Sequence, residues 1–205
     1  MNHEALRLFQ AVRLKGRALP VDLAAAAGLP LAVAGPLLDD LSASGHVVEA
    51  RERIKLTPEG RAALEELLAA ERAGVDGAAL TAGYHEFDAH NDALKGLMTR
   101  WQLKDESTPN DHTDPAYDQA VVADLVVLDE GFVPLLARFV ALAPRLGHYP
   151  ARFAHALEQI AAGDHTWFAR PLADSYHTVW FELHEDLIGL AGLTRADEAA
   201  AGRAL

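Results

Sequence analysis

Residues 174–190 read DSYHTVWFELHEDLIGL and combine aromatic, imidazole and carboxylate side chains within the length of one helix. Residues three, four and seven apart share a helix face, so His177, Trp180, Phe181 and His184 fall on one stripe. A helix that only filled a core would be built mainly from Leu, Ile, Val and Ala. We therefore expect this helix to form the central wall of a pocket with polar edges in an all-helical domain.

The chain before this helix predicts further helices. Apolar residues at helical spacing predict them over residues 80–103, 115–143 and 145–162. The second is apolar nearly all round, which favours the buried centre of the bundle. A Gly- and Ala-rich stretch over residues 73–83 predicts a linker, and Thr194 is expected to cap a final short helix. We therefore divide the chain into residues 1–75 and an acidic helical bundle over residues 76–205.

A small-molecule pocket needs apolar walls and a few directed polar groups. In the predicted bundle, the aromatic candidates for the wall are Trp101, Tyr117, Trp180 and Phe181. The polar candidates for ligand contacts are His90, Asn91, His112, His177 and His184. The alternative is that these residues are ordinary core aromatics with hydrogen-bonded histidines.

The same histidines raise the question of a metal site. The residue types that ligate zinc, iron or manganese occur at His85, His90, His112, His177 and His184, and at Glu86, Glu182 and Glu185. His177 and His184 would lie about 10 Å apart along a helix, too far to share one ion. Glu86 and His90, at positions i and i+4, have suitable spacing, and haem ligation by a histidine is a further alternative. We expect no cofactor and keep a metal-dependent enzyme as an alternative function.

Catalytic motifs are sparse. Asp111 with His112, and Asp174 with His177, are carboxylate–histidine pairs of the kind that move protons. No nucleophile elbow, phosphate loop or dinucleotide fingerprint accompanies them. The sequence therefore predicts no catalytic residues and a protein that is not an enzyme.

Charge is unevenly distributed along the chain, whose net charge is −12. Residues 1–72 hold nine Lys and Arg against ten Asp and Glu, whereas the remainder holds nine against twenty, a net of −11. The acidic part would repel nucleic acid, so any DNA contact is expected in the first 72 residues. The absence of Cys and of a long apolar run predicts a cytoplasmic protein with no membrane contact.

The N-terminal third has the pattern of a helix-turn-helix followed by a hairpin. Residues 23–30, LAAAAGLP, place small alanines and a turn glycine at the corner between two helices. A third helix is expected over residues 30–44, and two short β-like runs flank Arg51 and Glu52. Thr57 then caps a helix over residues 58–72.

Residues 45–68, GHVVEARERIKLTPEGRAALEELL, resemble the wing and following helix of MarR-like and PadR-like winged-helix regulators. The preceding LAAAAGLP and LLDDLSASG segments resemble their helix-turn-helix, so the resemblance covers residues 1–72. It implies that the third helix enters the DNA major groove while the wing contacts phosphates.

This sequence departs from the pattern in its third helix. The positions expected to face outward lack donors for bidentate base contacts; they are Ala32, Ala34, Gly35, Asp39 and Asp40. The basic residues expected to contact phosphates are Lys15, Arg17, Arg51, Arg53 and Lys55. DNA binding is therefore expected to be weak or led by DNA shape.

Together these observations predict a mainly α protein, with an N-terminal winged helix-turn-helix and small hairpin wing followed by an all-α bundle. The predicted function is a homodimeric transcriptional regulator whose bundle senses a small-molecule effector or mediates dimerisation. The alternatives are an accessory or scaffold protein whose winged helix docks protein, and the metal-dependent enzyme.

Overall fold

The computed structural model describes residues 2–105, 107–171, 173–194 and 200. It confirms the mainly helical class, with a two-stranded antiparallel hairpin after the first helices. The final helix predicted after Thr194 lies outside the described residues. The N-terminal elements are α1 (His3–Lys15), α2 (Pro20–Ala26), α3 (Leu31–Ala43), β1 (Val47–Ala50), β2 (Arg53–Leu56) and α4 (Pro58–Ala73).

Local capping explains where the N-terminal helices begin. The Asn2 side chain accepts a hydrogen bond from the Ala5 amide at 2.8 Å, and the Thr57 hydroxyl accepts one from the Gly60 amide at 2.9 Å. Gly60 also lies against the His46 carbonyl so closely that a Cβ would overlap it. The start of α4 is therefore fixed directly onto the segment that leads into the hairpin.

The hairpin pairs β1 with β2 in a register that separates two faces. Val48 lies opposite Lys55 and Ala50 opposite Arg53, and these residues are exposed. Ile54 and Leu56 point to the other face and are buried in the N-terminal core. An isolated bridge also joins Ala18 to Ile54, so the segment between α1 and α2 extends the hairpin.

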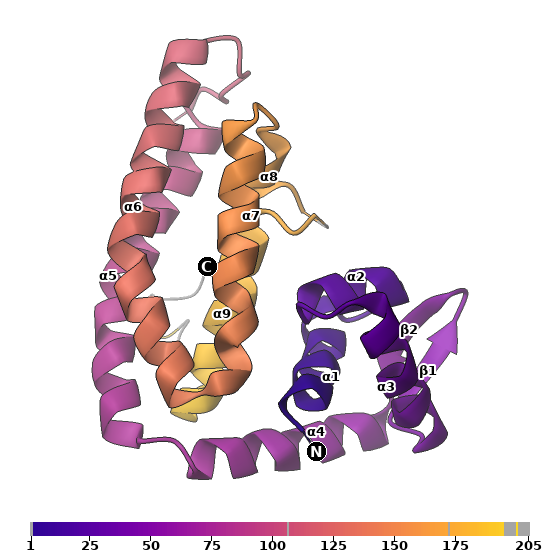
Figure 1. The fold of residues 1–205 in the computed structure, drawn as a ribbon. Coiled ribbons are helices and arrows are strands. Elements are labelled where there is room, and N and C mark those ends of the chain that lie inside the picture. Colours follow the sequence, from indigo (N-terminus) through magenta and orange to yellow (C-terminus); the bar gives the residue numbers. More distant parts are fainter. Residues whose placement is uncertain (1, 106, 172, 195–199, 201–205) are drawn as a thin grey trace.

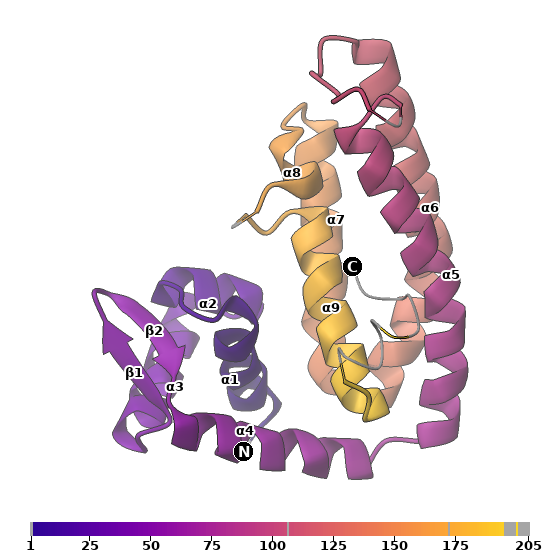
Figure 2. The ribbon, with the colours of Figure 1, turned by 180° about the vertical axis from the view of Figure 1, so that it is seen from behind.

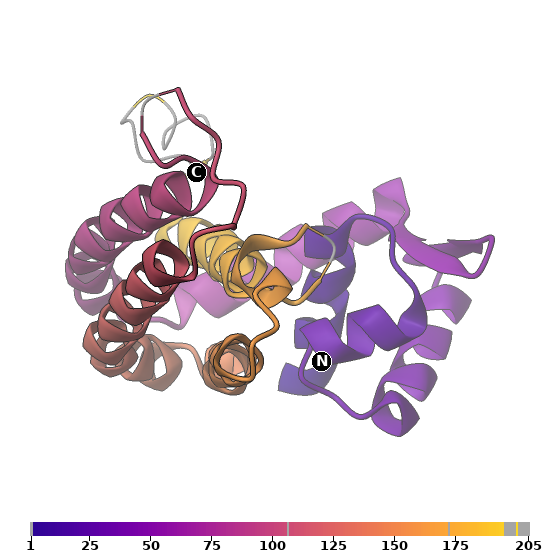
Figure 3. The same cartoon turned by 90° about the horizontal axis from the view of Figure 1, so that it is seen from above.

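The second half of the chain forms a helical bundle beside these elements. Figures 1 and 2 show α5 and α6 as a long antiparallel pair, with α4 crossing the base of the molecule towards them. Seen from above, the N-terminal elements lie on one side and the bundle on the other (Figure 3). The bundle elements are α5 (Gly77–Gln102), α6 (Pro115–Leu142), η1 (Pro144–His148), α7 (Tyr149–Ala161), α8 (Thr166–Ala169) and α9 (Tyr176–Ala191).

The buried centre of the bundle is α9, not α6 as the sequence suggested. α9 packs against α4, α5, α7 and α8, whereas one face of α6 exposes Val126, Val127 and Val133. The most exposed of them, Val127, is 67 % accessible. Apolar residues on all sides of α6 suggested a central helix, but the same pattern also arises when one apolar face of a helix is exposed.

Two hydrophobic cores lie on either side of the short connection over residues 74–76. One joins residues between Leu6 and Leu64, and the other joins residues between Leu80 and Leu190. No single helix in the described ranges is long and apolar enough to cross a membrane; α2 and α3 reach that threshold only together, with a 110° bend between them.

Candidate functional site

The aromatic stripe of α9 belongs to the core. Trp180 is 0 % exposed and donates its indole N–H to Asn91 Oδ1 at 3.0 Å. His184 Nε2 lies 3.0 Å from the Tyr84 hydroxyl, and both residues are buried. His177 and Phe181 are half-buried, and burial lowers the pKa of His177. The predicted pocket wall therefore packs the bundle interior, and the nine proposed ligand contacts do not line one cavity.

His90 lies in a separate hollow of about 380 Å³ beside Val127 and Gly131. Burial lowers the pKa of His90. Glu86, its expected partner for a metal, instead forms a bidentate ion pair with Arg138 at 2.6 and 2.9 Å. Within the part of the chain that the structure describes, no three His, Asp or Glu side chains gather as metal ligands.

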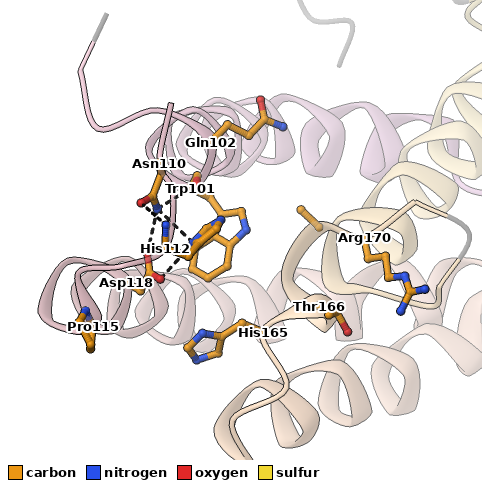
Figure 4. Close-up of a pocket in the computed structure, with 10 residues that line it drawn as sticks. Trp101, Gln102, Asn110, His112, Pro115, Asp118, His165, Thr166 and Arg170 are labelled. Atoms are coloured by element: carbon orange, nitrogen blue, oxygen red, sulfur yellow. Dashed lines mark hydrogen bonds and ion pairs between the residues drawn. The ribbon is translucent and has the colours of Figure 1, made fainter. Parts of the chain in front are cut away.

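A larger pocket, of about 720 Å³, lies where α5 ends, α6 begins and α8 packs across them (Figure 4). Trp101 and His112 of the predicted ligand contacts line it. Tyr117 lies nearby and donates its hydroxyl hydrogen towards the carbonyls of Arg100 and Leu103, at 2.9 and 3.1 Å. The other lining residues were not predicted from the sequence; they are Gln102, Asn110, Pro115, Asp118, His165, Thr166, Ala169 and Arg170.

A buried carboxylate orients the imidazole of His112. Asp118 Oδ2 lies 3.0 Å from His112 Nδ1, and Asp118 Oδ1 accepts a hydrogen bond from the Asn110 amide at 2.8 Å. The predicted pairing of His112 with Asp111 is wrong, because Asp111 pairs with Lys104 at 2.8 Å. That hydrogen bond holds the pKa of Asp111 below its usual range.

Trp101 is held between two rings. Phe168 stacks on it with ring centroids 4.2 Å apart, and His112 approaches with a centroid distance of 4.5 Å. His165 contacts it edge-on at 5.7 Å. These three ring contacts fix the indole in place at the pocket.

A second site, which the sequence did not predict, is a buried ionic layer between the N-terminal elements and the bundle. Asp186 of α9 accepts hydrogen bonds from Gln10 of α1 at 2.7 Å, Arg145 at 2.9 Å and Tyr149 at 2.6 Å. Arg145 also reaches Glu71 of α4 at 2.8 Å. The Arg145 and Asp186 side chains are each 1 % exposed. Charges that are buried in this way need good partners, and here each has at least two.

The same layer continues around Arg152. Its guanidinium pairs with Asp174 at 2.5 Å and with Glu182 at 2.6 Å, while Lys15 of α1 reaches Glu182 at 2.8 Å. The assignment of Lys15 to DNA contact is therefore wrong, because α9 neutralises it inside the molecule. The predicted pair of Asp174 with His177 is replaced by the pair with Arg152. Burial opposes ionisation of Asp174, but Arg152 and then Lys15 outweigh it and lower its pKa.

Three of the remaining basic residues proposed for DNA contact lie on the hairpin, and the fourth, Arg17, lies beside it. Arg17, Arg51, Arg53 and Lys55 are exposed, and Arg17 donates to the Ala50 carbonyl at 2.8 Å. None of the four forms an ion pair within the described ranges. The hairpin and the adjoining Arg17 thus carry four exposed cations without an ion pair among the described residues, together with the exposed carboxylates Glu49 and Glu52.

The outward face of α3 carries no such charge. Ala34 is buried rather than outward, while Ala32, Asp39 and Asp40 are exposed. Exposed apolar side chains also lie on α3, at Leu31 and Val33, and on α2, at Val21.

No family model, curated protein or solved structure matches the chain.

Proposed function

We propose that the protein is a DNA-binding transcriptional regulator, in which a winged helix-turn-helix contacts DNA and the bundle binds a small-molecule effector. The observation that carries the proposal is the unpaired hairpin cations Arg17, Arg51, Arg53 and Lys55. Positive charge without internal partners, in a chain of net charge −12, suits a polyanion such as the DNA backbone.

The order of the N-terminal elements supports this proposal. Two short helices, α2 and α3, follow one another closely and precede an antiparallel hairpin. The Ala18–Ile54 bridge places Arg17 beside the hairpin, so the four cations come from two segments of one small sheet.

Phosphate contact, rather than base reading, is the proposed mode of binding. The exposed side chains of α3 include Asp39 and Asp40 but no Arg, Lys, Asn or Gln, so the helix lacks the donors that read base edges. A homodimer would bring two hairpins to one duplex and multiply these weak contacts.

A continuous path connects the pocket with the N-terminal elements. The Arg170 carbonyl, at the pocket, accepts a hydrogen bond from the Ser175 hydroxyl at 3.1 Å, and Ser175 caps α9. The adjacent Asp174 lies 3.4 Å from Lys15 of α1. We propose that an effector in the pocket changes DNA affinity through this segment.

Fluorescence anisotropy with duplex DNA from the gene's upstream region, measured at several salt concentrations, tests DNA binding. The triple variant Arg51→Ala, Arg53→Ala, Lys55→Ala should weaken binding and reduce the salt slope by about 0.9 for each phosphate contact removed. The control variant Lys95→Ala, Arg100→Ala, Arg138→Ala removes the same charge from the bundle and should leave the affinity unchanged. Equal effects of the two variants, or no salt-sensitive binding by the wild type, would refute the DNA role.

A second candidate function is docking to a protein, which the exposed apolar side chains Val21 of α2 and Leu31 and Val33 of α3 favour. It predicts a stoichiometric partner that co-purifies with the wild type and is lost with Val21→Ser, Val33→Ser. No DNA affinity should then be measured.

A further inference from the structure

We infer that the pocket between α5, α6 and α8 binds a small organic monoanion, a carboxylate with an apolar body. That this carboxylate is the effector of a regulator rests on the proposed function. That the pocket binds a carboxylate does not depend on it. The volume of about 720 Å³ is within the range of small-molecule sites.

The pocket is preformed around His112. This residue has a φ of 56°, in the left-handed region that costs a non-glycine residue about 1 kcal/mol. Its backbone amide donates to Asn110 Oδ1 at 3.1 Å, while Asp118 holds its ring. Strain that several contacts maintain is typical of binding sites. Trp101, fixed between Phe168 and His112, gives the cavity a rigid wall.

The polar groups that remain for a ligand are mainly donors. Asp118 already accepts from Asn110 and lies against His112, and nearby Asp164 accepts from both the amide and the hydroxyl of Thr166. By contrast, no described residue accepts a hydrogen bond from the Trp101 indole N–H, the Gln102 side-chain amide or the Arg170 guanidinium, and Arg170 interacts with Asp164 only through their opposite charges. A ligand that complements this pocket therefore supplies acceptor atoms and negative charge.

Charge and shape select a carboxylate among anions. Arg170 is the single guanidinium among the described residues that line the pocket, and the sequence after residue 72 has a net charge of −11. One cation in this field suits a single negative charge better than the double charge of a phosphate monoester. Pro115, Ala169 and Trp101 supply apolar surface for the rest of the ligand.

Figure 4 shows the residues along which such a ligand would lie. Arg170 is at one end of the pocket, beyond Thr166, and Pro115 is at the opposite end, with Trp101 between them. The carboxylate would face the Arg170 end, and the apolar body would extend along Trp101 towards Pro115.

Three tryptophans make this inference testable at single-residue resolution in the full-length protein. The ¹H–¹⁵N indole signals, assigned with Trp101→Phe, are followed during titration with benzoate and hexanoate, their amides benzamide and hexanamide, and phenyl phosphate. At least one carboxylate should shift the Trp101 signal saturably, and more strongly than its amide or phenyl phosphate. The Trp180 signal, from a buried indole bonded to Asn91, is the internal control.

Arg170→Gln should weaken binding of that carboxylate by about tenfold, whereas Arg138→Gln, an exposed arginine paired elsewhere, should not. The inference is overturned if neither carboxylate shifts Trp101, if the amide or the phosphate binds as tightly, or if Arg170→Gln has no effect. DNA anisotropy on the same preparation separates the proposals, because a Trp101 response without DNA affinity retains the carboxylate site and removes the regulator.

Discussion

At the scale of the residue, Asp186 is the centre of the contact between the two halves of the protein. Burial alone would raise the pKa of this carboxyl, but Arg145 and the Tyr149 hydroxyl outweigh burial and lower it. Asp186 therefore stays ionised, and its charge joins α1, η1 and α9.

Replacing Asp186 with Asn keeps the size of the side chain and removes the charge. Arg145 would then keep only Glu71 as an anionic partner, and we expect the free energy of unfolding to fall by about 3 kcal/mol or more in urea denaturation. Glu86→Gln is the matched control, because it breaks a pair with Arg138 in which both side chains are 52 % exposed. It should cost far less, because solvent screens an exposed ion pair. Equal losses in the two variants would contradict the role of the buried layer.

His148 gives this contact a dependence on pH. Burial, together with the nearby Arg152 guanidinium, lowers the pKa of His148 to about 3, against about 6.5 in an unfolded chain. The unfolded state thus takes up the proton first, so stability is unaffected above pH 6.5 and falls as the pH drops from 6.5 towards 3.

Asp174 and Asp186 also reduce stability in acid, because folding lowers their pKa values. Replacing His148 with the uncharged Asn separates the contribution of His148 from theirs. Relative to pH 7.5, the wild type should lose about 2 kcal/mol more than His148→Asn at pH 5. Urea denaturation at both pH values measures the difference. Parallel losses in the two proteins would mean that His148 is protonated within the folded state.

At the scale of the element, the hairpin is built on an unfavourable turn. Arg51 and Glu52 have φ values of 54° and 61°, a conformation that a two-residue hairpin requires and that Asn and Gly adopt most readily. Arg51 therefore places a cation at the tip of the hairpin in a conformation that lowers the stability of the folded protein. Such a residue is consistent with a role in contacting a partner.

Glu52→Gly should relieve part of this strain and raise the free energy of unfolding by about 0.5–1 kcal/mol. Glu49→Gly, within β1, should lower it, because glycine is unfavourable in a strand. Thermal denaturation of the two variants provides the measurement, and a change of the same sign in both would exclude turn strain as the cause.

At the scale of the whole molecule, two hydrophobic cores are joined through a layer of charges. The layer couples them only while its carboxylates are ionised and paired, so we expect the wild type to unfold in one transition. The three tryptophans, at positions 101, 167 and 180, all lie in the bundle. Fluorescence therefore reports the bundle, whereas far-ultraviolet circular dichroism reports all helices.

The double variant Asp186→Asn, Glu182→Gln should separate the two urea transitions, because it removes one buried anion from each half of the layer. Glu86→Gln, Asp124→Asn removes two anions from exposed pairs and should leave the transitions coincident. If the curves of the first variant also coincide, packing rather than charge couples the two cores.

Much of the architecture was accessible from sequence because it depends on local patterns. Thr57 was identified as a cap from residue type alone, and its hydroxyl accepts the expected hydrogen bond. The hairpin around Arg51 and Glu52 was located because its strands are short, contiguous and bounded by a turn. The packing of α9 was harder to predict. Helical spacing places Trp180 and His184 on one face of this helix, but it does not determine whether that face borders a cavity or packs into a core.

By itself, the sequence determined the helices, the hairpin and the division of charge between the two ends of the chain, because each depends on residues close together in sequence. Only the tertiary structure decided that Lys15 is neutralised by Glu182, that Asp118 rather than Asp111 orients His112, and that Trp101 and Trp180 have different surroundings. Lys15 and Glu182, for example, are far apart along the chain, and a buried charge acquires its partner only when packing excludes water and brings distant segments together.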